Sequence, residues 1–350
     1  MSESRLIFTR EPLQEAARLI EGHHTVLFTD TNCRPLIAGF LDSRGLPAIV
    51  MEAGETHKNL DTVTEVWTMM QRYGCTRKSL LLNFGGGVVT DLGGFAAATF
   101  KRGIPFINIP TTLLGAVDAS VGGKTGIDFN GLKNEIGVFR EAERVIISTA
   151  FFGTLPREEL LSGYAEMIKH ALLSSADEYR RLIAFDIAEA DTAALLPLLE
   201  ENVKVKEKIV MADPTEKSVR RYLNLGHTAG HAIESLAIQR HIPIQHGYAV
   251  AVGMVVALVL SHIRLGFPSD MINELAAFIR SNYGGLPSLP LGCDDYPALL
   301  ELMSHDKKNP SPDAISFTLL KAAGEAVAGQ IIDPDTLRSS LDITRDLLGI

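Results

Sequence analysis

The first part of the chain alternates short apolar runs with amphipathic stretches. Apolar runs at residues 25–29, 46–51, 79–84 and 104–109 predict strands, and helical patterns at 11–20 and 58–73 predict helices between them. This alternation is typical of a parallel sheet with helices on its faces. We therefore expect an α/β domain at the N-terminus.

The pattern changes near residue 155, where strand signals give way to helical ones. Helices are predicted at 157–173, 177–185, 191–212, 223–237, 247–264, 270–281 and 295–304, followed by one strand signal at 315–320. A chain of 350 residues exceeds what one hydrophobic core usually holds. We expect two domains, 1–155 and 156–350, the second of them helical.

Composition narrows the class of protein. The net charge of -9 argues against a nucleic-acid partner, because neutralising phosphates requires a basic surface. Three widely spaced cysteines indicate neither a disulfide framework nor a cysteine metal site, which fits a reducing cytoplasm. The N-terminus lacks a secretory apolar segment. The apolar run at 248–260 is shorter than the roughly 20 residues that span a bilayer, so a buried helix and no membrane association are expected.

Four of the ten histidines, His227, His231, His241 and His246, fall between Asn224 and Gly247. His227 and His231 are four residues apart, which places them about one turn apart on the same face of a helix. With His246 and the upstream carboxylate of Glu166, they offer the imidazole and carboxylate ligands that zinc prefers. The alternative is a helix with one capping and one buried histidine and no metal.

Three glycines follow the strand predicted at 79–84, in the run Gly85-Gly-Gly-Val-Val-Thr-Asp91. Without side chains at these positions, backbone amides can approach a phosphate at the start of the next helix. A tight strand-to-helix turn without a ligand explains the glycines equally well.

A second candidate anion site surrounds Lys124, which follows two glycines and precedes Lys133 and Asn134. Cationic and amide donors of this kind suit a phosphate or a carboxylate. On its own, however, this motif is more simply read as a lysine on a turn.

Together these motifs resemble the 3-dehydroquinate synthase family of the sugar-phosphate cyclase superfamily. The resemblance runs from about Asp30 to Lys308. Besides the glycine run, its markers are Gly54-Glu-Thr-His-Lys58, Phe100-Lys-Arg-Gly103, Pro110-Thr-Thr112, Asp118-Ala-Ser-Val-Gly-Gly-Lys124, Leu132-Lys-Asn134, Ala165-Glu-Met-Ile-Lys169, Asn224-Leu-Gly-His-Thr-Ala-Gly-His231, His246-Gly247 and Asp306-Lys-Lys308.

The resemblance implies a Rossmann-like α/β domain that carries NAD and an all-α C-terminal domain that carries a divalent metal, usually zinc, with cobalt as the alternative. The active site would lie in the cleft between them, and family members usually form homodimers. By matching motifs, Glu166, His227 and His246 would bind the metal. His231 would face the substrate instead.

The substrate that the resemblance implies is 3-deoxy-D-arabino-heptulosonate 7-phosphate, which carries a carboxylate and a phosphate. The positions that match phosphate-binding residues or their neighbours are Arg102, Lys124, Asn134, Asn224, His231 and one of Lys307 and Lys308. Arg220 and Lys206, with Lys204 and Lys208 as close rivals, match positions nearer the carboxylate and ring hydroxyls, and Asp118 and Lys169 match others in the pocket. The positions that match the NAD site are Asp30, Asn32, Glu55, Lys58, Gly86, Gly87, Asp91, Thr111, Thr112, Lys133, Thr154, Leu155 and Glu159.

The implied reaction oxidises the C5 alcohol with NAD, eliminates phosphate, reduces the ketone, opens the ring and closes it again by an intramolecular aldol step. NAD is regenerated in each turnover. Zinc would make the alcohol more acidic and polarise the ketone. His231 would either relay a proton or only bind the phosphate.

Two features depart from the family pattern. Family members usually carry glutamate after the His-Gly pair, where this chain has Tyr248, and a change beside a ligand could alter metal affinity or metal choice. The loop before His246 also contains His241, which is a rival third ligand.

Three alternative functions follow from the same residues. Another sugar-phosphate cyclase would share the fold, NAD and metal, although Asn224 and His231 favour dehydroquinate synthase. A metal-dependent alcohol or glycerol dehydrogenase would usually carry Asp-x-x-Lys, whereas this chain reads Asp91-Leu-Gly-Gly. A catalytically silent binding protein would have lost a metal ligand or a phosphate-binding lysine, and none is lost here.

Overall fold

The computed structural model describes residues 5–130, 132–187, 192–242, 244–305 and 314–350. The chain forms two compact units. The first comprises Met1–Pro156 with Asp191–Val203, and the second comprises Arg157–Ala190 with Lys204–Ile350. Unlike the single predicted boundary at residue 155, this division also passes through one long helix, α7.

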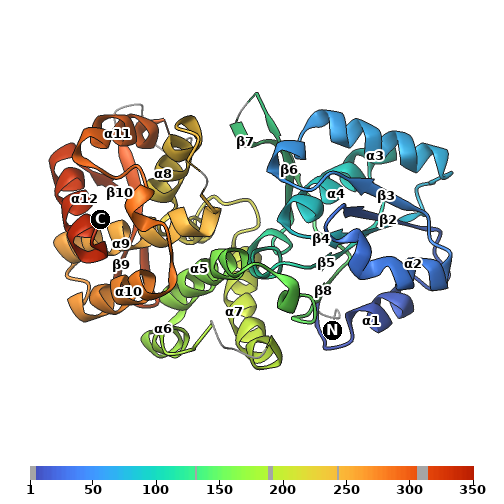
Figure 1. Ribbon diagram of the computed structural model, residues 1–350, viewed down its shortest axis with the longest axis horizontal. Helices are drawn as coiled ribbons and strands as arrows, with labels where there is room; N and C mark the ends of the chain where they lie inside the picture. The colour runs from blue at the N-terminus through green and yellow to red at the C-terminus, as the bar shows by residue number, and fades with distance from the viewer. Residues whose placement is uncertain (1–4, 131, 188–191, 243, 306–313) are drawn as a thin grey trace. The chain divides into compact units, whose positions relative to one another are not determined.

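The first unit is built on a six-stranded parallel sheet (Figure 1). Its strands are β1 (Leu6–Phe8), β2 (Thr25–Asp30), β3 (Ala48–Met51), β4 (Leu80–Gly85), β5 (Phe106–Pro110) and β8 (Arg144–Ile147), in the spatial order β1-β8-β5-β4-β2-β3. The neighbouring strands all run parallel. Strands β4 and β5 are buried along their whole length, as expected of a sheet that is covered on both faces.

Helices cover both faces of this sheet (Figure 1). They are α1 (Pro12–Leu19), α2 (Ala38–Arg44), α3 (Leu60–Arg72) and α4 (Gly87–Thr99). Residues of α1 and α2 pack with Leu80 and Leu82 on one face. On the other face α4 lies so close to the sheet that a Cβ at Gly93 would fall 2.2 Å from Asn83 Oδ1. The predicted α/β architecture is confirmed.

Short elements complete the first unit. An antiparallel hairpin of β6 (Lys124–Phe129) and β7 (Leu132–Phe139), absent from our predictions, packs against α4. Short 3-10 helices span Arg34–Ile37, Glu55–His57, Phe100–Arg102 and Phe152–Thr154, and a π-helical turn spans Gly115–Ala119.

The second unit is mainly helical. Its helices are α5 (Arg157–Ser174), α6 (Ala176–Ile183), α7 (Thr192–Ala212, shared with the first unit), α8 (His227–Gln239), α9 (His246–Leu265), α10 (Ser269–Asn282), α11 (Tyr296–Ser304) and α12 (Pro334–Leu348). Short 3-10 helices span Val219–Asn224, Leu286–Ser288 and Cys293–Asp295. One antiparallel hairpin of β9 (Ile315–Ala322) and β10 (Glu325–Ile332) joins them, so the unit is helical without being purely α.

Helix α9 forms the core of the second unit. This helix of twenty residues is long and apolar enough to cross a membrane, whereas the apolar run at 248–260 is too short. The side chains from Tyr248 to Ser261 are nevertheless buried against the rest of the protein. This burial is typical of a core helix.

Candidate active site

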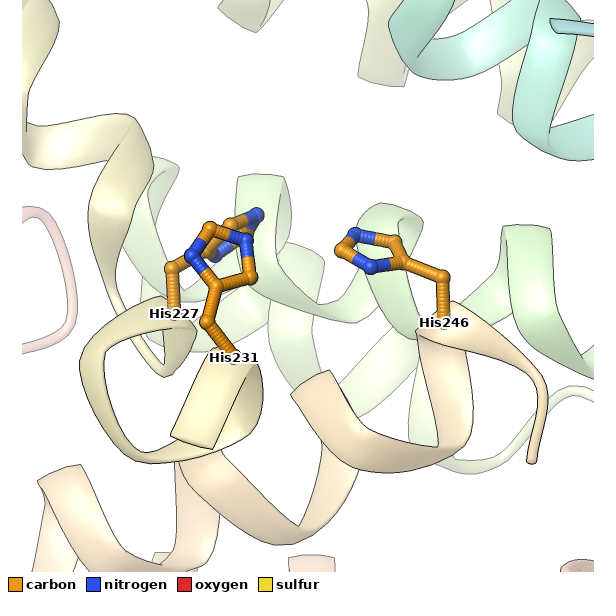
Figure 2. Close-up of side chains that lie close together, drawn as sticks. All are labelled: His227, His231 and His246. Carbon is orange, nitrogen blue, oxygen red and sulfur yellow. The ribbon is translucent and has the colours of Figure 1, made fainter. Parts of the chain in front are cut away.

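Three histidine rings meet where helices α8 and α9 begin. His227 is the first residue of α8, His231 lies one turn later, and His246 is the first residue of α9. The ring centroids are 5.1 Å apart for His227 and His231, 5.7 Å for His227 and His246, and 5.8 Å for His231 and His246. Figure 2 shows the three rings projecting toward the same space, and one ring nitrogen of each lies within 4.8 Å of the others. His241 is not part of this cluster.

Glu166 of α5 adds a carboxylate to two of these rings. Its Oε1 lies 3.5 Å from Nε2 of His227 and 3.7 Å from Nε2 of His246. Two ligands of a tetrahedral zinc ion are separated by about 3.3 Å, because each lies about 2.0–2.1 Å from the metal. The donor types and spacing of Glu166, His227 and His246 therefore fit a divalent cation.

The charges at this cluster favour a cation. Burial opposes the charged form of Glu166, but Lys169, His227 and His246 hold the pKa of this carboxyl well below its usual value. Burial likewise opposes the imidazolium of His246, yet the nearby carboxylates of Glu166 and Glu234 raise its pKa to about 10. A metal ion at this position would replace the His246 proton as the positive charge beside Glu166.

Both candidate ligand rings are held through their other nitrogen. His227 Nδ1 lies 3.1 Å from the carbonyl oxygen of Leu225, and His246 Nδ1 lies 3.1 Å from Oε2 of Glu234. Protons on Nδ1 would leave the Nε2 lone pairs facing Glu166, which is the tautomer a metal requires.

The segment between α7 and α8 carries further predicted residues. Burial raises the pKa of Asp213, but hydrogen bonds donated by the backbone amides of Lys217, Ser218 and Arg220 outweigh it and lower the pKa to about 2. Arg220 is buried and donates to the carbonyl of Pro214, and Asn224 donates to Glu216. Lys206 is buried on α7, and Lys169 is buried beside Glu166.

Sequence patterns missed two carboxylates of this unit, Glu216 and Glu234. Glu234 follows His227 by seven residues and His231 by three, which places all three on one face of α8. Helical periodicity could therefore have identified it. No sequence pattern indicates Glu216, because its contact with Asn224 depends on the backbone of the 3-10 helix Val219–Asn224.

In the first unit, predicted cofactor residues gather at the carboxyl ends of the strands. Asp30 ends β2, Gly86 directly precedes α4 and Gly87 begins it, and Thr111 and Thr112 follow β5. Strand β3 lies on one side of β2, and the next strand along the chain, β4, lies on the other side. The strand order therefore reverses between β2 and β4. Open α/β sheets bind nucleotides at this position.

Lys58 ties this edge to the β6–β7 hairpin. Its Nζ donates to Oδ2 of Asp91 at 2.6 Å and to Oδ1 of Asn134 at 2.7 Å. Burial opposes the ammonium, but the carboxylates of Asp91, Glu55 and Asp128 together outweigh it and raise the pKa of Lys58. Asn134 has a left-handed backbone, with φ of 51°, and its backbone N–H donates to Oδ1 of Asp128.

The remaining predicted residues occupy scattered positions. Asn32 follows β2, Glu55 begins a 3-10 helix and Lys133 lies in β7. Asp118 lies in the π-helical turn, Lys124 begins β6 and Arg102 ends a 3-10 helix with φ of 70°. Thr154 ends the 3-10 helix before α5 and Leu155 follows it, and Glu159, in the second unit, accepts a hydrogen bond from Gln245. Lys307 and Lys308 lie outside the described residues.

The overall fold is shared by cyclases and dehydrogenases of known structure. The 2-epi-5-epi-valiolone synthase of Streptomyces hygroscopicus, solved with NAD+ and Zn2+, matches with a TM-score of 0.83 and 25% identity over 99% of this chain and 98% of its own. A 2-deoxy-scyllo-inosose synthase solved with carbaglucose-6-phosphate, NAD+ and Co2+ matches with a TM-score of 0.82 and 23% identity, covering 96% and 95%. A probable glycerol dehydrogenase of Sinorhizobium meliloti matches at 0.62 and 15%, covering 99% and 97%.

The chain thus has the fold that these cyclases and dehydrogenases share, and its second unit carries the carboxylate-histidine cluster. The sequence-family models of the N-terminal and C-terminal parts of 3-dehydroquinate synthase match residues 48–162 and 163–309 of this chain. The 3-dehydroquinate synthases of Parabacteroides distasonis and Listeria monocytogenes are 45% and 40% identical, over 100% and 91% of this chain and 100% and 88% of their own. The chain belongs to the 3-dehydroquinate synthase family, which confirms the resemblance found in its sequence.

Proposed function

We propose that the chain is a lyase that converts 3-deoxy-D-arabino-heptulosonate 7-phosphate into 3-dehydroquinate and phosphate, with NAD and a divalent cation, zinc or cobalt, as cofactors. Family membership supports the reaction. The observation that carries the metal assignment is the convergence of Glu166 Oε1 on the Nε2 atoms of His227 and His246. The cyclases of similar fold that were solved with NAD+ and Zn2+ or Co2+ support the cofactors.

The two cofactors would supply the redox and Lewis-acid chemistry. When bound, NAD accepts and returns one hydride, and the cation draws electron density from the hydroxyl and ketone oxygens. Glu166, His227 and His246 would hold the cation, and the carboxyl edge of the sheet, with Asp30, Gly86 and Gly87, would hold NAD.

The remaining residues would bind and orient the substrate. Lys124, Asn134 and Arg102 offer donors for its phosphate, and Arg220 and Lys206 offer cationic donors for its carboxylate. His231, which the proposed ligand set leaves outside the metal shell, can donate a hydrogen bond to the phosphate. The proton lost next to the ketone can pass to the departing phosphate itself, directly or through the His231 imidazole.

The test is an assay of the purified protein with the heptulosonate phosphate, substoichiometric NAD and zinc. We expect phosphate and dehydroquinate to form without lasting absorbance of NADH. The activity of Glu166→Ala and of His246→Ala should each fall by more than roughly 100-fold. Removing a residue that only hydrogen-bonds a metal ligand can cost roughly that much, and removing the ligand itself should cost more. His241→Ala is the matched control, because His241 lies in the loop just before His246 but outside the cluster. The activity of this variant should stay near that of the parent.

Other results would point elsewhere. Absence of phosphate release with zinc, cobalt and other divalent metals would overturn the proposal. Release from a different sugar phosphate would indicate another cyclase, and steady NADH accumulation from simple alcohols would indicate a dehydrogenase.

A further inference from the structure

Glu234 is a buried carboxylate directly behind one candidate metal ligand. Glu234 is 5% exposed, and its Oε2 lies 3.1 Å from Nδ1 of His246. The two residues come from different helices, α8 and α9, so the contact spans the packing between them. A buried carboxylate needs such a partner, because burial otherwise strongly penalises its charge.

The residue after the His-Gly pair does not fill this role. Tyr248, where family members usually have glutamate, packs its ring against Tyr283 with centroids 4.6 Å apart. Among the described contacts, the acceptor for His246 Nδ1 is Glu234. The orientation of His246 is therefore set from α8 rather than from its own helix.

We propose that Glu234 is a positioning residue for metal binding, an inference that rests on the proposed metal site. Its carboxylate accepts the Nδ1 proton of His246, fixes the tautomer with the Nε2 lone pair toward Glu166, and makes the imidazole a stronger ligand. His227 has the equivalent support from the Leu225 carbonyl, which belongs to the backbone. Glu234 is thus the support that a side-chain substitution can remove.

The test measures zinc affinity by competition with a chelator, together with the visible spectrum of the cobalt-substituted protein. We expect Glu234→Gln, whose amide oxygen still accepts a weaker hydrogen bond, to bind zinc about 10-fold less tightly. Glu234→Ala, which removes the acceptor, should lose about 100-fold. Both should change the cobalt absorption bands, because the hydrogen bond that fixes the His246 ring is weakened in the first variant and lost in the second.

Tyr248→Phe is the matched control, since it alters a neighbouring side chain without touching the Nδ1 contact. Its zinc affinity and cobalt spectrum should equal those of the parent. If the folded Glu234 variants bind zinc as tightly as the parent and keep its cobalt spectrum, the positioning role is overturned while the metal site stands. If His246→Ala binds zinc as tightly as the parent, the proposed metal site itself is wrong. Should Glu234→Ala fail to fold, the Glu234→Gln result decides.

Discussion

The Lys58 side chain has two partners that predictions from the sequence did not supply. Its resemblance to an NAD-binding position remains a prediction, and two of its three ammonium hydrogens are already used by Asp91 and Asn134. Because Oδ1 of Asn134 accepts from Lys58, the side-chain nitrogen Nδ2 of Asn134 is the group that would face a phosphate. Lys58 therefore has a structural role whether or not it contacts NAD.

Replacing Lys58 by methionine should leave the Asp91 carboxylate buried beside an apolar chain. We expect the free energy of unfolding to fall by about 3–5 kcal/mol, because one partner of a buried ion pair is lost. The double variant Lys58→Met/Asp91→Leu should recover much of this loss. Urea denaturation measures both, and Lys78→Met, which changes an exposed lysine, should stay within about 0.5 kcal/mol of the parent. Equal stability of the parent and Lys58→Met would contradict the ion-pair assignment.

At the scale of elements, helices α8 and α9 approach each other closely because glycines lie where they cross. A Cβ at Gly253 would fall 2.1 Å from the carbonyl oxygen of Gly226 and 2.6 Å from the amide nitrogen of Gly230. Both distances are far inside normal contact, so the two backbones can approach this closely only without a side chain at Gly253. This approach places the starts of both helices, and with them His227 and His246, side by side.

Gly253→Ala should force the two helices apart. Because the obstructing atoms belong to the backbone, we expect a loss of about 1–3 kcal/mol or more in unfolding free energy, together with weaker zinc binding. Gly39→Ala makes the same change in α2 where a Cβ meets nothing within 4 Å, and its stability should match or exceed that of the parent by up to about 1 kcal/mol. Thermal denaturation and zinc titration of both variants make the comparison, and unchanged zinc binding in Gly253→Ala would refute the coupling.

Elements were predictable from sequence where their signal is local. The buried strands β2, β4 and β5 are mostly apolar, with Asn83 and Asn108 inside β4 and β5, and the sequence predicts all three. The predicted helix at 223–237 begins later, at His227, because residues 219–224 form a 3-10 helix and Gly226 adopts a left-handed φ of 79°. Strand β1 has three residues, too few for a periodic pattern, and the β6–β7 hairpin does not belong to the main sheet.

At the scale of the whole molecule, each proposed cofactor has its own unit. The three proposed metal ligands all belong to the second unit, and the proposed NAD residues belong to the first except for Glu159. Motif matching listed candidates for both sites. It could not find the Glu234 contact with His246, because that contact depends on how α8 and α9 pack.

Hydrogen exchange should separate the two cofactors. Zinc at about 100 times its Kd should stabilise the second unit by about 2.7 kcal/mol and slow exchange in α8 and α9, whereas NAD should protect the ends of β2 and β4. Removing zinc with a chelator should reverse the first effect and leave the second. Protection of β2 and β4 by zinc alone would contradict this division.

The position of His227, His231 and Glu234 on one face of α8 has a consequence for protein engineering. A metal ligand, a neighbouring imidazole and the support for the ligand on α9 all turn with one helix. The cluster therefore takes its geometry from the packing of α8 against α9, and Glu166 of α5 completes it with a carboxylate. A designer who transplanted it into another helical bundle would need to supply a glutamate in the place of Glu166 and a small residue in the place of Gly253.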